Sequence, residues 1–229
     1  MKVIITSGGT SEAIDQVRAI TNHSTGSLGK ALAEFFLDKG DQVSLVTTKR
    51  ALKPEAHPNL SIQLIESVSD LKDCLEELVP SHDALIHAMA VSDYRPVYMT
   101  DIKELEEAAN VRDFLNKRNQ ESKISSDADT QVLFLQKNPK IISLIKEWKP
   151  DIQLIGFKLL VGVEKQELIQ VARASLIKNR ADLIVANDLL EVTSNSHKAL
   201  LVQENRVDQA ENRLEIAQKI YAHIHKESL

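Results

Sequence analysis

The sequence contains a single cysteine, Cys74, among 229 residues. One thiol excludes an internal disulfide and any zinc site built from several cysteines. Because Cys74 lies in the amphipathic segment 70–78, we interpret it as a packing residue and not as a nucleophile. No apolar stretch approaches the roughly 20 residues of a membrane-spanning helix, and the N-terminus lacks the pattern of a signal peptide. We therefore expect a cytoplasmic protein that does not bind membranes.

The sequence also lacks an excess of positive charge, because its 28 Lys and Arg residues are outnumbered by 33 Asp and Glu residues, which gives a formal charge of −5. Without a general basic field, nonspecific binding to nucleic acid is not expected. Any phosphate site must be built locally, from backbone amides and a few lysines. The length and the 43% hydrophobic content fit one large α/β domain over residues 1–229.

The most informative segment is the N-terminus. An apolar run, Val3–Ile5, leads into Ser7-Gly8-Gly9-Thr10, as a buried strand leads into a glycine turn. A second cluster of small residues, Asn22–Gly29, precedes apolar positions at helical spacing. Either cluster alone is equally consistent with an ordinary loop and a Ser/Thr helix cap. Together they favour a phosphate or nucleotide site at a helix N-terminus.

This segment is not a standard dinucleotide motif. The second expected strand, 42–46, ends in Thr47-Thr48-Lys49-Arg50, with no acidic residue to hold a ribose, which argues against NAD. Lys49 and Arg50 could contact the extra phosphate of NADP, so an NAD(P)-dependent reductase remains an alternative. A nucleotide-binding regulator without catalytic activity is another.

The remaining pattern predicts a doubly wound, Rossmann-like fold with a mainly parallel sheet and a small antiparallel β extension near 199–208. Further strands are expected at 60–65, 84–90, 131–135, 152–157 and 181–188. Ligands bind at the carboxyl ends of such strands. Asp93 follows one of these ends and is a candidate functional acid, with turn capping as the alternative. His87 and Trp148 are interpreted as core residues.

Residues 97–130 are highly charged, with only a thin apolar stripe. We expect a surface helix followed by a polar flap that acts as a lid, although plain disorder would have the same composition. Asn138 and Pro139 then predict a helix start, with Asn138 as the N-cap and Pro139 in the first turn.

Several motifs together resemble one family, the phosphopantothenate–cysteine ligases of coenzyme A biosynthesis. The matching pieces follow the family's order: Ser7–Thr10, Val17-Arg18, Asn22–Gly26, Ala90–Tyr94, Lys137–Pro139, Ile155–Phe157, Lys178-Asn179 and Ala186–Asp188. The match starts at the first strand, so the chain resembles the free-standing bacterial form, without the fused decarboxylase domain.

The resemblance implies a two-step reaction. The carboxylate of 4′-phosphopantothenate attacks the α-phosphate of CTP, the favoured nucleotide, or of ATP, and releases pyrophosphate. The amine of L-cysteine then displaces the nucleoside monophosphate from the acyl-nucleotidylate. Family members use Mg²⁺, and the resemblance also implies a homodimer. No metal ligand is assigned.

The resemblance also implies site residues. Asn22 would contact the acyl group and Lys123, in the flap, would close over the phosphates. The nucleotide would contact Gly8, Gly9, Thr10, Asp93, Pro139, Ile141, Phe157 and Lys178. The substrate and its phosphate would contact Ser24, Thr25, Gly26 and Ala90. His23 is interpreted as an orienting residue, with a catalytic role as the alternative. Ala174 and Lys158-Leu159 depart from the usual bacterial pattern, which leaves the choice between CTP and ATP open.

Overall fold

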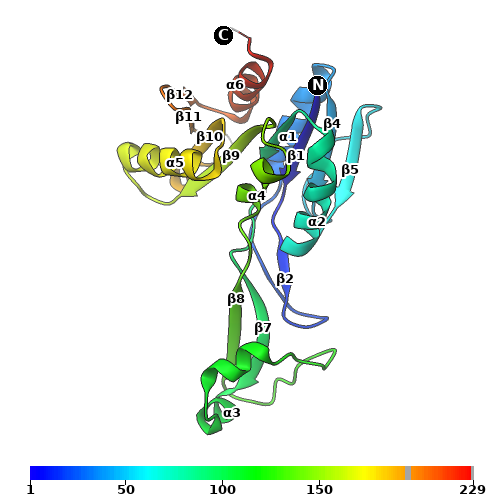
Figure 1. The fold of residues 1–229 in the computed structure, drawn as a ribbon, viewed down its shortest axis with the longest axis vertical. Coiled ribbons are helices and arrows are strands. Elements are labelled where there is room, and N and C mark those ends of the chain that lie inside the picture. The colour runs from blue at the N-terminus through cyan, green and yellow to red at the C-terminus, as the bar shows by residue number, and fades with distance from the viewer. Residues whose placement is uncertain (194–196, 228–229) are drawn as a thin grey trace.

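The computed structural model describes residues 1–193 and 197–227. The chain forms a layered body with a long two-stranded arm that extends from one end of it (Figure 1). Within the described residues, no helix is long and apolar enough to cross a membrane.

The body is built on an eight-stranded sheet in the order β12-β11-β10-β9-β6-β1-β4-β5. The strands that pair in parallel are β1 (Lys2–Ser7), β4 (Gln42–Thr47), β5 (Leu60–Leu64), β6 (Ala84–His87), β9 (Gln153–Leu160) and β10 (Leu183–Asp188). The chain runs outward from β1 to one edge and then returns to β6 on its other side. This is the strand order of a doubly wound fold, whose ligand crevice lies where the order reverses. The predicted fold class is confirmed.

The predicted antiparallel extension is also present. Strands β11 (Ala199–Val202) and β12 (Val207–Ala210) form a hairpin that continues the sheet beyond β10. The hairpin buries the apolar residues of β11 in the two cores.

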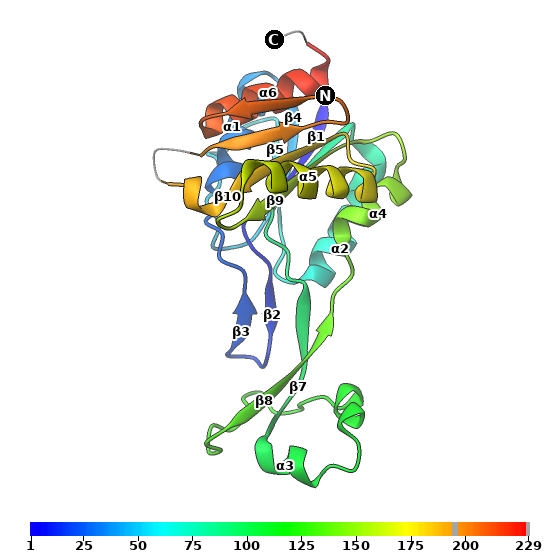
Figure 2. The same ribbon diagram turned by 90° about the vertical axis from the view of Figure 1, so that its left-hand side faces the viewer.

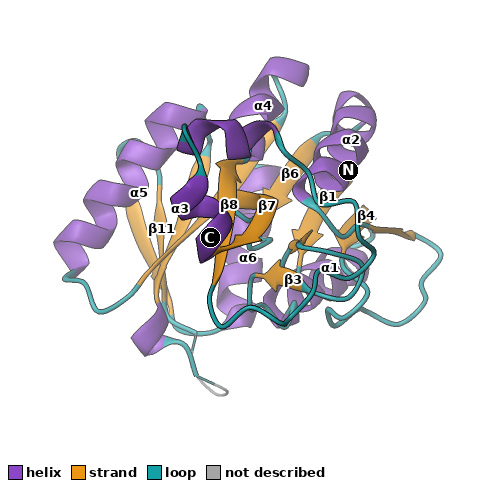
Figure 3. Ribbon diagram, turned by 90° about the horizontal axis from the view of Figure 1, so that it is seen from below, coloured by secondary structure: helices purple, strands orange, loops and turns teal. Residues whose placement is uncertain are grey.

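Helices cover both faces of the sheet (Figure 3). One face packs against α1 (Ser27–Asp38) and α6 (Arg213–His225). The other packs against α2 (Val68–Leu78), α4 (Ile141–Trp148) and α5 (Lys165–Asn179). Each helix buries one apolar stripe, and the near-continuous apolar runs of the central strands are buried on both faces, as expected for a parallel sheet. Cys74 and Trp148 both pack against the second core, as predicted.

The segment 97–130 differs from its prediction. Its first residues do not form a surface helix, because 97–101 belong to strand β7 (Tyr94–Asp101). This strand pairs antiparallel with β8 (Gln131–Lys137) to make the arm, and the short helices α3 (Ile102–Glu107) and η2 (Val111–Asn116) lie at its far end (Figure 2).

The arm has a small aromatic core of its own. The ring of Phe114, which is 1% exposed, stacks between Tyr98 and Phe134 with centroid distances of 5.8 and 5.0 Å. One ring of this core comes from η2 and the other two come from strands β7 and β8. Because three rings are enough to order the segment, its other residues can be polar.

Two local features also differ from the sequence prediction. The loop after the glycine turn contains a hairpin of β2 (Ser11–Ala13) and β3 (Ala19–Thr21), which extends along the arm (Figure 2). Helix α4 begins at Ile141 with Lys140 as its N-cap, so the prediction of Asn138 as N-cap was wrong. The backbone amide of Asn138 donates instead to the carbonyl of Asp93, at 2.8 Å, which keeps this residue extended.

Candidate functional site

The crevice of the sheet lies where the chain leaves β1 and β6. An isolated parallel bridge joins Gly9 to Ala90, and the amide of Thr10 donates to the carbonyl of Ala90 at 3.0 Å. The hydroxyl of Thr10 lies 2.9 Å from that of Ser92 and accepts from the Ser92 amide at 2.9 Å. The glycine turn and the segment after β6 are thus held together by hydrogen bonds. Gly8, the remaining residue of the turn, accepts from the amide of Ala90 at 2.9 Å.

Asn22 lies directly against Gly9. A Cβ atom at position 9 would stand 2.2 Å from the carbonyl oxygen of Asn22, a distance that no side chain tolerates. The amide of Asn22 donates to the carbonyl of Thr10 at 3.2 Å. The absence of a side chain at Gly9 therefore lets Asn22 approach the crevice.

The loop after Asn22 leads into the N-terminus of α1. Ser24 and Thr25 are exposed, and Gly26 adopts a positive φ of 74° as the N-cap. The carbonyl of Gly26 accepts from the hydroxyl of Ser7 at 3.2 Å, which binds the loop to the end of β1. Gly26 has no side chain to cap α1, and the hydroxyl of Thr25 accepts from the first helical amide, that of Ser27, at 3.3 Å. Such a helix N-terminus favours an anion.

A pocket of about 380 Å³ opens beside the crevice. Five residues that the sequence analysis assigned to nucleotide binding line it: Asp93, Pro139, Ile141, Phe157 and Lys178. They come from four separate elements or connections, namely the segment after β6, the start of α4, strand β9 and the end of α5. The fold brings these residues together, whereas the remaining predicted residues lie at the crevice or farther away.

The pocket has a buried floor and a charged mouth. His87, Met89 and Ile141 are each at most 7% exposed. The lysines Lys140, Lys158 and Lys178 lie at the more open side, and Lys140 forms an ion pair with the carboxylate of Asp93. Three ammonium groups against one carboxylate make the mouth suitable for a polyanion.

His87 was interpreted as a core residue, and it is buried, yet its ring also lines the pocket. Burial lowers the pKa of His87 to about 4. The ring is therefore neutral at neutral pH.

Sequence reasoning did not predict the hydrogen bonds of three buried polar residues, Asn138, Ser92 and Glu12, that hold the site together. Asn138 donates from its side chain to the carbonyl of Ser92 at 3.1 Å and to the Glu12 carboxylate at 3.4 Å. The same Glu12 oxygen accepts from the amide of Val68, at the start of α2, at 2.9 Å. Both Ser92 and Asn138 fall within the motifs that carried the resemblance, but nothing in the sequence pairs Asn138 with an acid 126 positions away.

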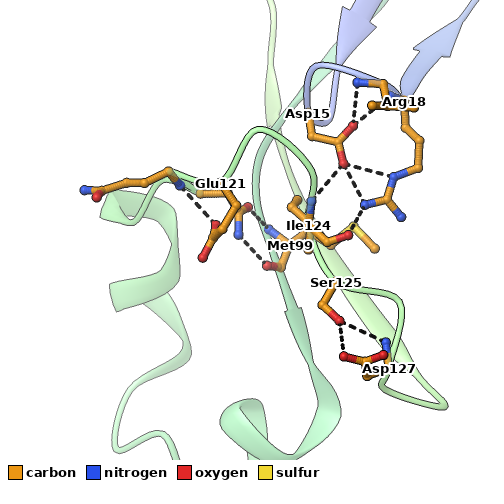
Figure 4. A network of polar contacts seen from close by, with 10 residues as sticks. Asp15, Arg18, Met99, Glu121, Ile124, Ser125 and Asp127 are labelled. Carbon is orange, nitrogen blue, oxygen red and sulfur yellow. Dashed lines mark hydrogen bonds and ion pairs between the residues drawn. The ribbon is translucent and has the colours of Figure 1, made fainter.

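Lys123 is exposed and does not line the pocket. Its neighbours are bonded to the tip of the β2–β3 hairpin (Figure 4). The Asp15 carboxylate accepts from the Ile124 amide at 3.1 Å, and Arg18 donates to the Ile124 carbonyl at 2.9 Å. The Ser122 carbonyl accepts from the backbone of the same hairpin at 3.1 Å. The loop that carries Lys123 is thus fixed on both sides of that residue.

No cluster of three or more His, Cys, Asp or Glu side chains with metal-binding geometry occurs within residues 1–193 and 197–227. Among the described residues that line the pocket, Asp93 supplies the one carboxylate. Mg²⁺ commonly binds through phosphate oxygens and only one or two carboxylates. The pocket therefore fits a cation that arrives with a nucleotide.

The chain is similar in sequence and fold to proteins of one known family. The family described as the DNA/pantothenate metabolism flavoprotein C-terminal domain matches residues 1–107 and 99–228. A DNA/pantothenate metabolism flavoprotein of known structure from Streptococcus pneumoniae is 54% identical, with a TM-score of 0.95 over 99% of each chain. The structure of the C-terminal domain of the coenzyme A biosynthesis bifunctional protein CoaBC is 25% identical, with a TM-score of 0.72 over 98% of this chain and 94% of that one.

Among curated proteins, the coenzyme A biosynthesis bifunctional protein CoaBC of Thermococcus kodakarensis is 29% identical over 229 residues. The alignment covers 98% of this chain and 51% of that protein, so the chain spans about half the length of this relative. Since the family match extends over almost the whole sequence, the chain belongs to the family of DNA/pantothenate metabolism flavoprotein C-terminal domains.

Proposed function

We propose that the chain is a phosphopantothenate–cysteine ligase, which joins 4′-phosphopantothenate to L-cysteine through an acyl-nucleotidylate, with CTP favoured and ATP possible. The observation that carries this proposal is the single pocket that Asp93, Pro139, Ile141, Phe157 and Lys178 line together. These residues were selected for nucleotide contact from four separate parts of the sequence. Their convergence beside the crevice of a doubly wound sheet fits a nucleotide site. The membership in a family of pantothenate metabolism also supports the proposal.

In the first step, the substrate carboxylate attacks the α-phosphate. The phosphates lie at the mouth of the pocket, where Lys140, Lys158 and Lys178 offset their charge, and toward the glycine turn Gly8–Thr10. Asp93, as the carboxylate of the pocket, would help to hold a Mg²⁺ ion that arrives with the nucleotide, and the ion would supply neutralisation of the phosphate charge. Lys123 supplies a further ammonium group as the flap closes. The phosphate of 4′-phosphopantothenate lies at Ser24–Gly26, against the N-terminus of α1.

In the second step, the amine of cysteine attacks the activated acyl carbon. Both reacting groups belong to substrates, so the protein needs a hydrogen-bond donor for the developing oxyanion more than it needs a nucleophile. Asn22 fits this role, because Gly9 allows it to approach the crevice and its side-chain amide can donate. Ala90, which is bridged to Gly9, lies beside the same glycine turn.

The proposed enzyme is a homodimer. The arm of β7 and β8 projects from the body, supported by its own small core and by the β2–β3 hairpin, and an isolated two-stranded ribbon is marginally stable in water. Packing against a second copy would stabilise the arm. Light scattering at micromolar concentration tests this point, and a monomer would contradict it.

One assay tests the activity. The protein is incubated with 4′-phosphopantothenate, L-cysteine, Mg²⁺ and either CTP or ATP, and the release of pyrophosphate is measured. We expect release that requires phosphopantothenate, with CTP the better co-substrate. Nucleotide binding without release would point to a regulator, and a change in nicotinamide absorbance with NADPH would point to a reductase. Either result would overturn the proposal.

A further inference from the structure

His87 presents one ring nitrogen to the pocket while the other is occupied. Its Nδ1 lies 2.9 Å from the hydroxyl of Thr6, on the neighbouring strand β1. Among the described residues, Nε2 has no hydrogen-bond partner. Since it is not one of the unpartnered polar atoms that are fully buried, Nε2 retains some contact with solvent. The residue is 7% exposed and lines the pocket, so this small exposed edge carries Nε2.

The bonds of Thr6 determine where the ring proton resides. The Thr6 hydroxyl is fully buried and accepts from the amide of Met89 at 3.2 Å. Its own proton must go to an acceptor, and within the described residues His87 Nδ1 is the acceptor in reach. A neutral imidazole that accepts at Nδ1 carries its proton at Nε2. The ring therefore offers an N–H donor to the pocket.

The position of His87 determines which part of a ligand would receive this proton. The ring shares the floor with Met89 and Ile141, both at most 7% exposed, while the lysines lie at the mouth. Phosphates belong beside the lysines, so the uncharged nucleoside is the part that reaches the floor. An uncharged acceptor suits a neutral donor, and a buried donor left without a partner would weaken binding.

We propose that His87 contacts the nucleotide, donating its Nε2–H to an uncharged oxygen of the nucleoside, either the carbonyl of a pyrimidine base or a ribose hydroxyl. This inference rests on the proposed nucleotide site. The two oxygens predict different selectivity, because cytosine has a ring carbonyl and adenine has none, whereas both nucleotides carry the same ribose.

The first test uses the unmodified full chain labelled with ¹⁵N at histidine. Without nucleotide, we expect the His87 resonances of the Nε2–H form, with Nδ1 unprotonated. Addition of CTP or ATP with Mg²⁺ should shift Nε2 of His87 more than Nδ1. A ring protonated at Nδ1, or Nε2 resonances that do not move when the nucleotide binds, would overturn the inference. If neither nucleotide binds, the result contradicts the proposed nucleotide site and with it the proposed function.

The second test compares variants by calorimetric titration with CTP and with ATP. His87→Leu fills the site without a donor and should weaken binding about 3- to 10-fold, the range of one hydrogen bond of ordinary strength. His87→Gln retains an N–H donor and should recover most of the affinity. His57→Gln, at an exposed loop histidine outside the pocket, is the control and should bind as the unmodified chain does.

The two nucleotides distinguish the two oxygens. A loss for CTP alone identifies the base carbonyl, and an equal loss for both identifies the ribose. Unchanged affinity of folded His87→Leu for both nucleotides would overturn the inference while leaving the nucleotide site itself intact. If His87→Leu does not fold, the resonances of the unmodified chain still decide the question.

Discussion

The carboxylate of Asp15 and the backbone amide of Ile124 are joined by a hydrogen bond of 3.1 Å across 109 residues of chain. The Asp15 side chain is fully screened from solvent and also accepts from Arg18, which holds the pKa of Asp15 well below its usual range. The guanidinium of Arg18 in turn donates to the carbonyl of Ile124. Both peptide groups of Ile124 are thus bound to the hairpin, immediately beside Lys123.

Replacing Asp15 by Ala should free this loop. The variant loses the acceptor that joins Ile124 and Arg18, so residues 117–130 should become more sensitive to proteolysis and nucleotidylate formation should slow. Limited proteolysis and rapid-quench measurement of the first step check both effects. Asp127→Ala is a matched control, because within the described part of the chain Asp127 bonds only to Ser125, in the same loop. Equal cleavage of the Asp15→Ala variant and the unmodified chain would contradict the prediction.

Lys123 should matter for activation and not for folding. Its side chain is exposed and belongs to no core, so Lys123→Gln should leave the melting temperature nearly unchanged. The ammonium group reaches the phosphates only after the flap closes, so nucleotidylate formation should slow strongly. Bound nucleotide, Mg²⁺ and phosphopantothenate should also protect residues 97–130 from proteolysis. A fully active Lys123→Gln with equal cleavage in the presence and absence of ligands would leave the flap without a catalytic role.

The sheet and its crevice followed from the sequence because both depend on local patterns. The apolar run Val3–Ile5 before a glycine turn, and the run Leu183–Ala186, are typical of strands that are buried on both faces of a parallel sheet. The residues of the pocket were named from the resemblance to a known family, and of these Asp93 was also expected from its place after a strand end.

The parts that were not predicted depend on contacts between distant residues. The arm is ordered by a stack of Tyr98, Phe114 and Phe134, which the charged composition of the segment concealed. Asn138 has the local signature of a helix cap, but its side chain is used by Ser92 and Glu12 instead. Tertiary hydrogen bonds to a buried acid outweighed the local preference of Asn138.

Acid should destabilise the fold in part through His87. The pKa of His87 in the folded chain is about 4, below the usual 6.5, so the unfolded chain takes up the proton first as the pH falls. The free energy of unfolding should therefore fall between pH 6.5 and pH 4, by at most about 1.4 kcal/mol per pH unit for each such proton. His197, whose pKa burial also lowers to about 4, acts in the same direction.

Urea unfolding at pH 7 and at pH 5 measures this contribution. His87→Gln removes one titrating group, so its loss of stability between these two pH values should be smaller than that of the unmodified chain. The same loss in both proteins would show that His87 does not differ in pKa between the folded and unfolded chain.

Asn22→Asp should impair amide formation more than activation. A carboxylate places negative charge where negative charge develops, and loss of one such donor typically costs about 10²–10³ in rate. The acyl-nucleotidylate should accumulate, which can be detected by quenching the reaction and separating the products. Normal amide formation by the Asn22→Asp variant would contradict the proposed role of the Asn22 side chain in stabilising the oxyanion.

Gly9→Ala tests whether Asn22 acts through its position. The added methyl group would stand 2.2 Å from the carbonyl oxygen of Asn22, so the backbone of Asn22 must move away from the crevice. Overpacking of this kind costs about 1–3 kcal/mol of stability, and a donor displaced by about 1 Å can lose about 10² in rate. Gly9→Ala should therefore accumulate the same intermediate as Asn22→Asp, although its asparagine amide is intact. Rapid-quench analysis of the two variants at equal folded concentration compares them directly. If Gly9→Ala formed the amide at the normal rate, the close approach of Asn22 to Gly9 would serve packing alone.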